Sequence, residues 1–435
     1  MRSGHEIPPG VSLPEPASVS ASLGEAPVGN PELSVIRELV AIPGAPEAIA
    51  RDEHHWLKVR SAYALDDTLI NLESGGGSPS PRIVLEALKR RLDYSNTIPA
   101  VAMWRVLEPQ REIVRRRLAQ QCGVDPEEIA ITRSASEGLQ ICQCGIDLAP
   151  GDEVLTTNQD YVRMLWTYDQ RARREGIVLR QISIPVPCED PAEIVRRFEH
   201  AITPRTRAVL MSHVINLSGQ IMPVREVADM VHARGLPLIV DGAHSFAHTV
   251  FRITDLHCDY FAASLHKWLC APHGTGVLYV RRDRIAGLWP LTAAPAALQD
   301  DIRKFEEVGT YEVAHVLGIA EALAFHQAVG PERKEARLLY LRDYWMNRLR
   351  AQKRIHWNTS QMPGMACGFG NFDIPGTNLQ TFGRWLLDEH GVVIHVTEHA
   401  EYAGIRVTPN VFTTLSELDR FCDAVEAGLR MGIGT

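Results

Sequence analysis

Residues 240–281 read VDGAHSFAHTVFRITDLHCDYFAASLHKWLCAPHGTGVLYVR, and two polar clusters in this stretch each follow an apolar run. Leu236–Val240 precedes Asp241, and Tyr260–Ala263 precedes His266 and Lys267. Short apolar runs of this kind are typical of strands buried in a parallel sheet. Ligands of open α/β sheets collect at the carboxyl ends of the strands. The sequence therefore predicts that Asp241 and Lys267 meet at one edge of a sheet.

The pairing of an aspartate with a lysine indicates a particular cofactor. Lys267 follows Asp241 by 26 residues, so separate strands carry the two side chains. Pyridoxal 5'-phosphate (PLP) requires both groups, because its aldehyde forms a Schiff base with an amine and its pyridine nitrogen needs an acidic partner. We therefore expect an enzyme that handles amino acids through PLP, with Lys267 and Asp241 as its catalytic residues.

Outward from this stretch, apolar runs alternate with helix-like segments, which is typical of a mainly parallel sheet with helices on both faces. The expected strands are 128–132, 153–156, 178–184, 208–212, 236–240, 260–263 and 276–280. Helices are expected at 82–92, 191–201 and 224–234. The last part of the chain predicts helices 331–350, 379–390 and 415–429 with strands 355–358, 392–396 and 404–407.

Three regions follow from this pattern. Residues 1–31 are rich in proline and predict a flexible N-terminal tail or an arm that lies on a partner. Residues 32–305, which begin with a helical pattern over 32–66, form an N-terminal segment and a large domain, and residues 306–435 form a smaller C-terminal α/β domain. Residues 71–81 contain three consecutive glycines, which either let the backbone approach another group closely or form a plain connector.

Four more segments supply polar groups to the same sheet edge. Residues 131–138 form a strand end, a turn and a helix start, which suits a phosphate, although Ser134 or Ser136 could simply cap the helix. Tyr161 could stack on a flat ring, and Asn216 could bond a phenolic oxygen. Arg406 could bind a carboxylate with both arms of its guanidinium, or form a buried salt bridge with a protein Asp or Glu.

Composition indicates which partners and which cellular setting are compatible with the chain. A formal net charge of −8 argues against a general nucleic-acid surface. The eight cysteines show no repeating spacing, so we expect a reducing, cytoplasmic setting. Because no stretch approaches 18 apolar residues and the N-terminus lacks a signal-peptide pattern, we expect neither a membrane span nor a signal peptide.

The stretch 240–281 resembles the cofactor-lysine signature of the class V aminotransferases, a family of fold-type I PLP enzymes that includes cysteine desulfurases, kynureninases and isopenicillin N epimerase. The similarity runs from about residue 66 to the end. The segment around Lys267, the glycine-rich opening and Arg406-Val-Thr-Pro-Asn are most similar to the branch of isopenicillin N epimerase. The resemblance implies the fold-type I architecture, a large domain with a mainly parallel seven-stranded sheet plus the smaller domain.

The resemblance also implies roles for single residues. It assigns Lys267 to the cofactor aldehyde, Asp241 to the pyridinium nitrogen and Arg406 to the substrate carboxylate. The remaining cofactor contacts that it implies are Tyr161 on the ring, Asn216 and His244 near the phenolic oxygen, and Ala135, Ser136, Ser264 and His266 at the phosphate. Gly309-Thr310 matches a segment that reaches the phosphate of the neighbouring subunit, so a homodimer with shared active sites is implied.

One departure from the family concerns sulfur chemistry. Cysteine desulfurases carry a nucleophilic cysteine before the substrate arginine, whereas residues 390–403 contain none, which disfavours desulfuration. The same stretch offers His395, His399 and Tyr402. The two histidines have the spacing of a metal pair on a helix, but their neighbours predict strand and loop, which argues against a metal site. A contact from a lid over the active site stays open for them.

We expect reaction at Cα of an α-amino acid, by transamination or epimerisation, on a substrate of specialised metabolism. Elimination or substitution at the side chain, and oxygen-dependent decarboxylation or deamination, stay open. A third hypothesis is a non-catalytic protein that binds PLP or a partner. The presence of Lys267, Asp241 and Arg406 argues against this hypothesis.

Overall fold

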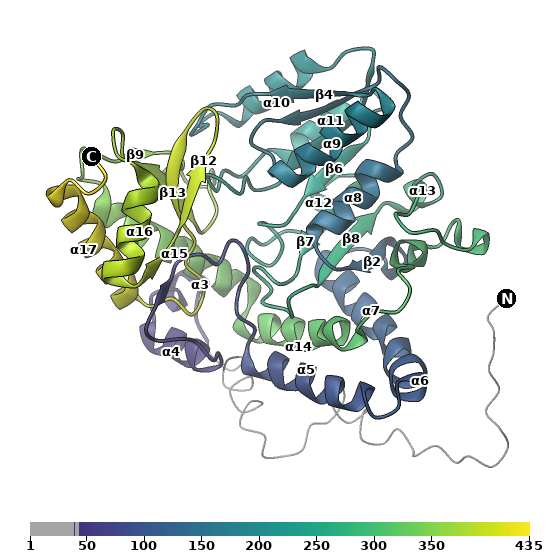
Figure 1. The fold of residues 1–435 in the computed structure, drawn as a ribbon, viewed down its shortest axis with the longest axis horizontal. Helices are drawn as coiled ribbons and strands as arrows, with labels where there is room; N and C mark the ends of the chain where they lie inside the picture. Colours follow the sequence, from purple (N-terminus) through teal and green to yellow (C-terminus); the bar gives the residue numbers. More distant parts are fainter. Residues whose placement is uncertain (1–38, 40–42) are drawn as a thin grey trace.

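The computed structural model describes residue 39 and residues 43–435, and it is shown in Figure 1. The predicted tail at 1–31 and part of the predicted helical stretch 32–66 lie outside the described residues. In the described part of that stretch the chain forms two short helices, α3 (Pro46–Ile49) and α4 (Glu53–Ser61). Asp52 begins α4 by accepting bonds from the backbone of His54 and His55.

The centre of the molecule is a seven-stranded sheet in the order β2-β8-β7-β6-β5-β3-β4. Only β8 runs antiparallel to its neighbours in this sheet, so the predicted mainly parallel seven-stranded sheet is confirmed. Its strands are β2 (Ile129–Thr132), β3 (Glu153–Thr157), β4 (Val178–Ile182), β5 (Thr206–Ser212), β6 (Leu238–Asp241), β7 (Tyr260–Ser264) and β8 (Gly276–Val280). The predicted strand 236–240 is shifted in the structure, because Pro237 lacks the N–H that a central strand would use.

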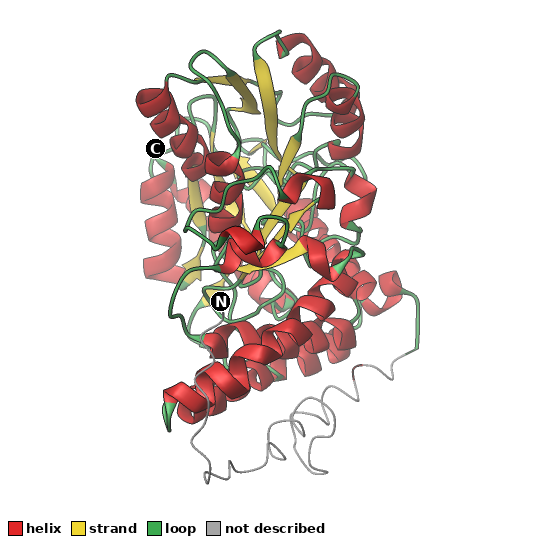
Figure 2. Ribbon diagram, turned by 90° about the vertical axis from the view of Figure 1, so that its right-hand side faces the viewer, coloured by secondary structure: helices red, strands yellow, loops and turns green. Residues whose placement is uncertain are grey.

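Alternate residues of these strands pack into two different cores, one on each face of the sheet. In β6, Leu238 and Val240 join the larger core, while Ile239 joins the core on the other face. Helices cover both faces, as Figure 2 shows. The helices of this part of the chain are α5 (Arg82–Ser95), α6 (Pro99–Val101), α7 (Arg111–Cys122), α8 (Ala135–Gly145), α9 (Val162–Glu175), α10 (Pro191–Ala201), α11 (Val224–His232), α12 (Ile253–Leu256), α13 (Arg282–Ile285) and α14 (Val313–Val329). A π-helical turn, η2 (Ala102–Leu107), and four 3₁₀ turns, η3 (Glu108–Gln110), η4 (Pro126–Glu128), η5 (Ala296–Leu298) and η6 (Ile302–Glu306), complete this part.

The C-terminal elements gather around a separate core, at the left of Figure 1. Their sheet has the order β12-β13-β10-β9. The elements are α15 (Pro331–Leu349), β9 (His356–Trp357), β10 (Gly370–Asp373), α16 (Leu379–His390), β11 (Val392–Val393), β12 (His395–Glu398), β13 (Ala403–Val407) and α17 (Leu415–Met431). The predicted strand 392–396 is two strands, and β11 pairs in parallel with β1 (Ile70–Asn71). The domain limits at 305 and 306 stay a prediction.

In the part of the chain that the structure describes, no single helix is long and apolar enough to cross a membrane; α14 and α15 meet both criteria only as a pair bent by 74°.

Candidate active site

A cavity of about 290 Å³ opens where β5, β6 and β7 end. The N-terminal ends of α8 and α9, strands β12 and β13 and the glycine-rich loop before α5 complete its walls. Ten of the eleven residues predicted for the site line this one cavity. They are Ala135, Ser136, Tyr161, Asn216, Asp241, His244, Ser264, His266, Lys267 and Arg406.

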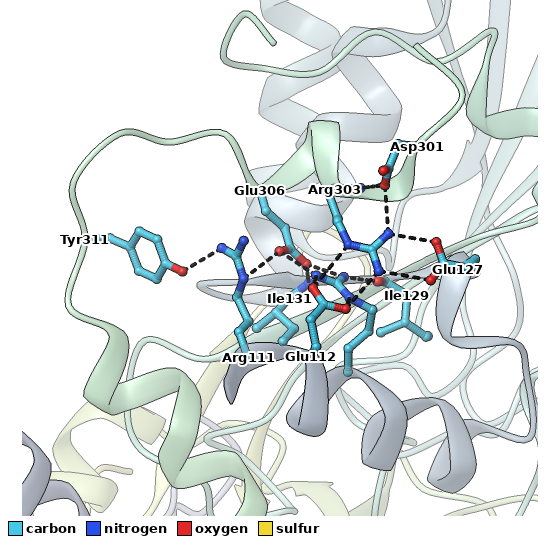
Figure 3. Close-up of polar contacts among 10 residues, drawn as sticks. Arg111, Glu112, Glu127, Ile129, Ile131, Asp301, Arg303, Glu306 and Tyr311 are labelled. Atoms are coloured by element: carbon cyan, nitrogen blue, oxygen red, sulfur yellow. Dashed lines mark hydrogen bonds and ion pairs between the residues drawn. The ribbon is translucent and has the colours of Figure 1, made fainter. Parts of the chain in front are cut away.

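Thr310, the eleventh, is exposed and lies beside a different cavity, which Tyr311 and Glu306 line. Figure 3 shows how its neighbour is held: Arg111 donates to the hydroxyl of Tyr311 at 2.6 Å and lies 3.3 Å from Glu306. The loop that carries Thr310 is thus fastened to α7 through Tyr311 and Arg111. Its predicted contact with a neighbouring subunit stays a prediction.

Lys267 projects its amine into the cavity beside His244. The Lys267 Nζ lies 3.1 Å from the Nε2 of His244. Burial lowers the pKa of Lys267 to about 8, and the positive charge of Arg406 adds to this effect, while Asp241 opposes it. A lysine with this pKa can both hold and release a proton near neutral pH.

Asp241 stands at the end of β6, directly beside Ser212 at the end of β5. Its Oδ1 accepts a bond from the backbone N–H of Ala243 at 2.9 Å. Burial raises the pKa of Asp241 to about 6, while that N–H and the charge of Lys267 oppose the rise. At pH 7 the group is therefore mainly a carboxylate, which can partner a protonated ring nitrogen.

Asp160 is a buried carboxylate that the sequence did not reveal. Its Oδ1 accepts from the backbone N–H and the hydroxyl of Ser212, each at 2.7 Å. Its Oδ2 accepts from the hydroxyls of Thr156 and Thr157 at 2.7 and 2.8 Å, and from the Thr157 N–H at 2.9 Å. These five bonds fix the turn that presents Tyr161 to the cavity. The Thr156-Thr157 pair before Asp160 was the available signal.

The helix start at 134–136 forms the end of the cavity predicted for the phosphate. The hydroxyl of Ser134 caps α8 by accepting from Glu137, and the Ala135 N–H donates to the hydroxyl of Ser264 at 2.9 Å. A Cβ at Gly276 would lie 2.6 to 2.7 Å from backbone atoms of Ser134, so only glycine lets β8 pass behind this turn. Ser134 is therefore the N-cap of α8, as one of the two interpretations predicted. The helix end still faces the cavity, where its dipole favours an anion.

Arg406 already has a protein partner. Its Nη2 lies 2.6 Å from Glu73 and its Nη1 donates to the backbone carbonyl of Asn216 at 2.9 Å. The salt-bridge alternative is therefore present in the structure, and Glu73 is a site residue that the sequence did not reveal. The Arg406 Nε and the Asn216 Oδ1 are buried without a hydrogen-bond partner in the described residues.

Of His395 and His399, which precede β13, only the first lies at the cavity. His395 lines it and is the strand partner of Arg406. His399 instead lies 3.0 Å from the backbone carbonyl of Asn158 through its Nε2. Within residue 39 and residues 43–435, no group of three or more His, Cys, Asp or Glu side chains could hold a metal ion.

The cavity fits PLP on its own chemistry. It offers an amine of lowered pKa, a buried carboxylate, an aromatic ring at Tyr161 and the N-terminus of α8. The unpartnered Asn216 Oδ1 and Arg406 Nε add a buried acceptor and a buried donor that a ligand can satisfy.

Comparison with known proteins gives the same assignment. The family model described as "Aminotransferase class-V" matches residues 70–421. The chain is 29% identical over 389 residues to isopenicillin N epimerase from Streptomyces clavuligerus, covering 86% of this chain and 98% of that protein. Both the predicted family and the predicted similarity to this epimerase are confirmed.

Two solved structures share the fold. A cysteine desulfurase from Escherichia coli matches with a TM-score of 0.76 at 22% identity, over 86% of this chain and 98% of that one. A C-DES mutant with glycine covalently linked to its PLP cofactor matches with a TM-score of 0.72 at 22% identity, over 82% and 97%. These likenesses confirm the predicted fold-type I architecture.

Proposed function

Because the chain belongs to the aminotransferase class V family, a family of PLP enzymes, we propose that it acts at Cα of an α-amino acid, by transamination or epimerisation. The observation that carries the proposal is the meeting of Lys267, Asp241 and Arg406 around one cavity of about 290 Å³. An amine, a buried carboxylate and a guanidinium in one site can serve the amino, ring and carboxylate ends of a cofactor–substrate pair.

PLP is the cofactor of this family, and when bound it supplies an electron sink for negative charge that develops at Cα. Asp241 holds a proton on the ring nitrogen, because its carboxylate is mainly ionised at pH 7. Lys267 is the group that removes and returns the Cα proton through its Nζ, and its lowered pKa suits this exchange near neutral pH. Arg406 orients the substrate carboxylate, which fixes the bond at Cα that is broken.

The remaining residues hold and enclose the cofactor. The start of α8 with Ser136, together with Ser264, takes the phosphate, and Tyr161 takes one face of the ring. We infer that the Gly309-Thr310 loop of a second copy completes the phosphate site, which makes the functional unit a homodimer. The substrate of specialised metabolism expected from the sequence belongs to this proposal as well.

The lining of the cavity argues against a desulfuration that uses a nucleophilic cysteine. Among the described residues that line the cavity there is no cysteine. Cys367, for example, is buried, and burial raises its pKa to about 12. A thiol with this pKa is a poor nucleophile.

Deuterium exchange tests the proposal. The PLP-loaded enzyme is incubated in D₂O with single α-amino acids, and Cα deuteration is followed by NMR, with Lys267→Ala as the control. We expect at least one amino acid to exchange its Cα hydrogen only when Lys267 is intact. Exchange with inversion indicates epimerisation, and a keto acid indicates transamination. Absence of exchange across all amino acids would reject the proposal.

A further inference from the structure

The contact between Glu73 and Arg406 has consequences for the substrate. The Arg406 side chain is 5% exposed, and Glu73, 21% exposed, occupies its Nη2 at 2.6 Å. The Arg406 Nη1 is taken by the carbonyl of Asn216, and its Nε is buried without a partner in the described residues. A substrate carboxylate that binds Nε and Nη2 together therefore competes with Glu73 for Nη2.

The glycine-rich loop is built around this ion pair. A Cβ at Gly75 would lie 2.9 Å from the Arg406 Nη2, and a Cβ at Gly76 would lie 3.3 Å from the Glu73 Oε1. The loop is held in place at both ends, since the Gly75 N–H donates to the Thr408 hydroxyl at 3.1 Å and the Ser78 N–H donates to the carbonyl of His266 at 2.9 Å. The predicted close approach of the loop is therefore an approach to the Arg406 guanidinium. The same approach places Glu73 against that guanidinium.

Glu73 is also a wall shared by two cavities. It lines the active-site cavity and a neighbouring cavity of about 380 Å³. That second cavity contains the carboxylates of Asp66 and Glu417 as well, against a single arginine, Arg60. The charge of Arg60 is already engaged, at 3.1 Å from Glu417 and 3.0 Å from Asp67. The region next to Glu73 therefore favours positive charge.

We propose that the substrate is an α-amino acid whose side chain ends in a cationic group, and that Glu73 is the residue that selects it. This inference rests on the proposed function. The α-amino group is committed to the cofactor, so the α-carboxylate exchanges with Glu73 on Arg406. Glu73 then keeps only a weak contact with the Thr408 hydroxyl, at 3.5 Å, and has no positive partner among the described residues. A cation on the substrate side chain neutralises the displaced Glu73 by forming an ion pair with it. A neutral side chain leaves the negative charge of this partly buried carboxylate uncompensated.

Two matched pairs of probes test this. L-lysine is compared with L-norleucine, and L-arginine with L-citrulline. The second member of each pair has a side chain of nearly the same length but without the positive charge. Dissociation constants for the PLP-loaded enzyme are read from the change in the cofactor absorption band. In at least one pair, we expect the wild type to bind the cationic member at least about tenfold more tightly. In Glu73→Gln, which keeps the shape and removes the charge, we expect that preference to fall below about twofold, because the neutral member binds more tightly and the cationic member more weakly.

Glu398→Gln is the matched control. Glu398 is an exposed residue of β12 that accepts a bond from Gln380, and the preference should survive its replacement. Equal or tighter binding of the neutral member in both wild-type pairs would overturn the proposal, as would an equal loss of affinity for both members in Glu73→Gln. If other amino acids exchange their Cα hydrogen while none of these probes binds, the substrate class is wrong and the proposed function stands. If no amino acid exchanges, both fail.

Discussion

The Nε2 of His244 lies 3.1 Å from the Nζ of Lys267. The other ring nitrogen of His244, Nδ1, accepts a bond from the indole N–H of Trp268 at 3.4 Å. Burial and the charge of Lys267 lower the pKa of His244 well below its usual range, so its ring is neutral and carries one N–H. Because Nδ1 accepts, that proton is on Nε2 and points at Lys267, which favours the unprotonated amine.

Capture of PLP by the apoprotein should therefore depend on pH with a midpoint near the Lys267 pKa of about 8. Only the neutral amine attacks an aldehyde, so the rate should rise with pH and level off above the midpoint. In Trp268→Phe, His244 is free to accept a bond from a charged Lys267, which should raise the midpoint by less than about one pH unit. Stopped-flow absorbance measures both profiles, and a midpoint that falls or stays in place in the variant would contradict this role of Trp268.

Lys267 should be the lysine that carries the cofactor. Borohydride reduction of the PLP-loaded enzyme should fix the cofactor to Lys267, and Lys267→Ala should lose this label and its yellow colour. Lys304 is an informative comparison, because burial lowers its pKa too, but its amine donates to the carbonyls of Ile285 and Gln299 at 2.6 and 2.8 Å. Peptide mapping that finds reduced cofactor on any other lysine would refute the assignment.

Asp241→Asn should lower turnover by at least about 10²-fold, because the variant no longer holds the proton on the ring nitrogen. The two side chains are nearly isosteric, so the fold should survive. Asp283→Asn, on an exposed residue whose carboxylate bonds Arg281, is the control. The raised pKa of Asp241, about 6, means that its charge is present above pH 6 and lost as pH falls below it. Near-normal turnover in folded Asp241→Asn would reject this role.

Much of the fold could be predicted because buried parallel strands are continuous apolar runs. Much of the site could be predicted because its residues directly follow those strands. Helix α14 gave no such signal: 13 of its 17 residues between Val313 and Val329 are buried, and so it lacks a clear amphipathic period. Strand β10, Gly370–Asp373, has a single large apolar residue, Phe372, and is a strand because β13 and β9 pair with it.

The ion pair at Arg406 shows a different limit. Its partner Glu73 lies 333 residues away in the sequence, and the spacing of residues carries no information on such a contact. The same reason hid Asp160, which reaches Ser212 across 52 residues. The sequence predicted that Arg406 needs a carboxylate, and only the three-dimensional structure shows which protein group supplies one.

Arg406→Ala should weaken binding of the amino-acid substrate by about 10- to 100-fold while PLP stays bound. The loss should be larger in a Glu73→Gln background, because there the guanidinium faces no competing carboxylate. A double-mutant cycle of dissociation constants, read from the cofactor absorption band, measures this difference. Unfolding of Arg406→Ala would instead show that the ion pair serves stability, and equal losses in the two backgrounds would show that Glu73 does not compete.

The buried ion pair of Arg115 and Glu306 should stabilise the large domain and the loop that follows it. Arg115 is fully buried, its Nη1 and Nη2 lie 2.6 and 2.9 Å from Glu306, and Glu306 also accepts the Ile131 N–H of β2 at 2.7 Å. Figure 3 shows Glu306 of η6 beside Ile131 of β2 and Glu112 of α7. The loop of Thr310 follows η6 directly in the chain.

Glu306→Gln leaves the buried charge of Arg115 with one carboxylate, Glu112, at 3.1 Å, and with the carbonyl of Ile129, so the free energy of unfolding should fall by about 3 kcal/mol. The measurement is a denaturant midpoint at unchanged slope. Lys89→Gln, which removes an exposed ion pair with Glu86, should cost less than about 1 kcal/mol. If the loop of Thr310 completes the phosphate site of a second copy, Glu306→Gln should also raise the dissociation constant for PLP. A destabilised variant that still forms dimers and binds PLP normally would place the loop outside the cofactor site.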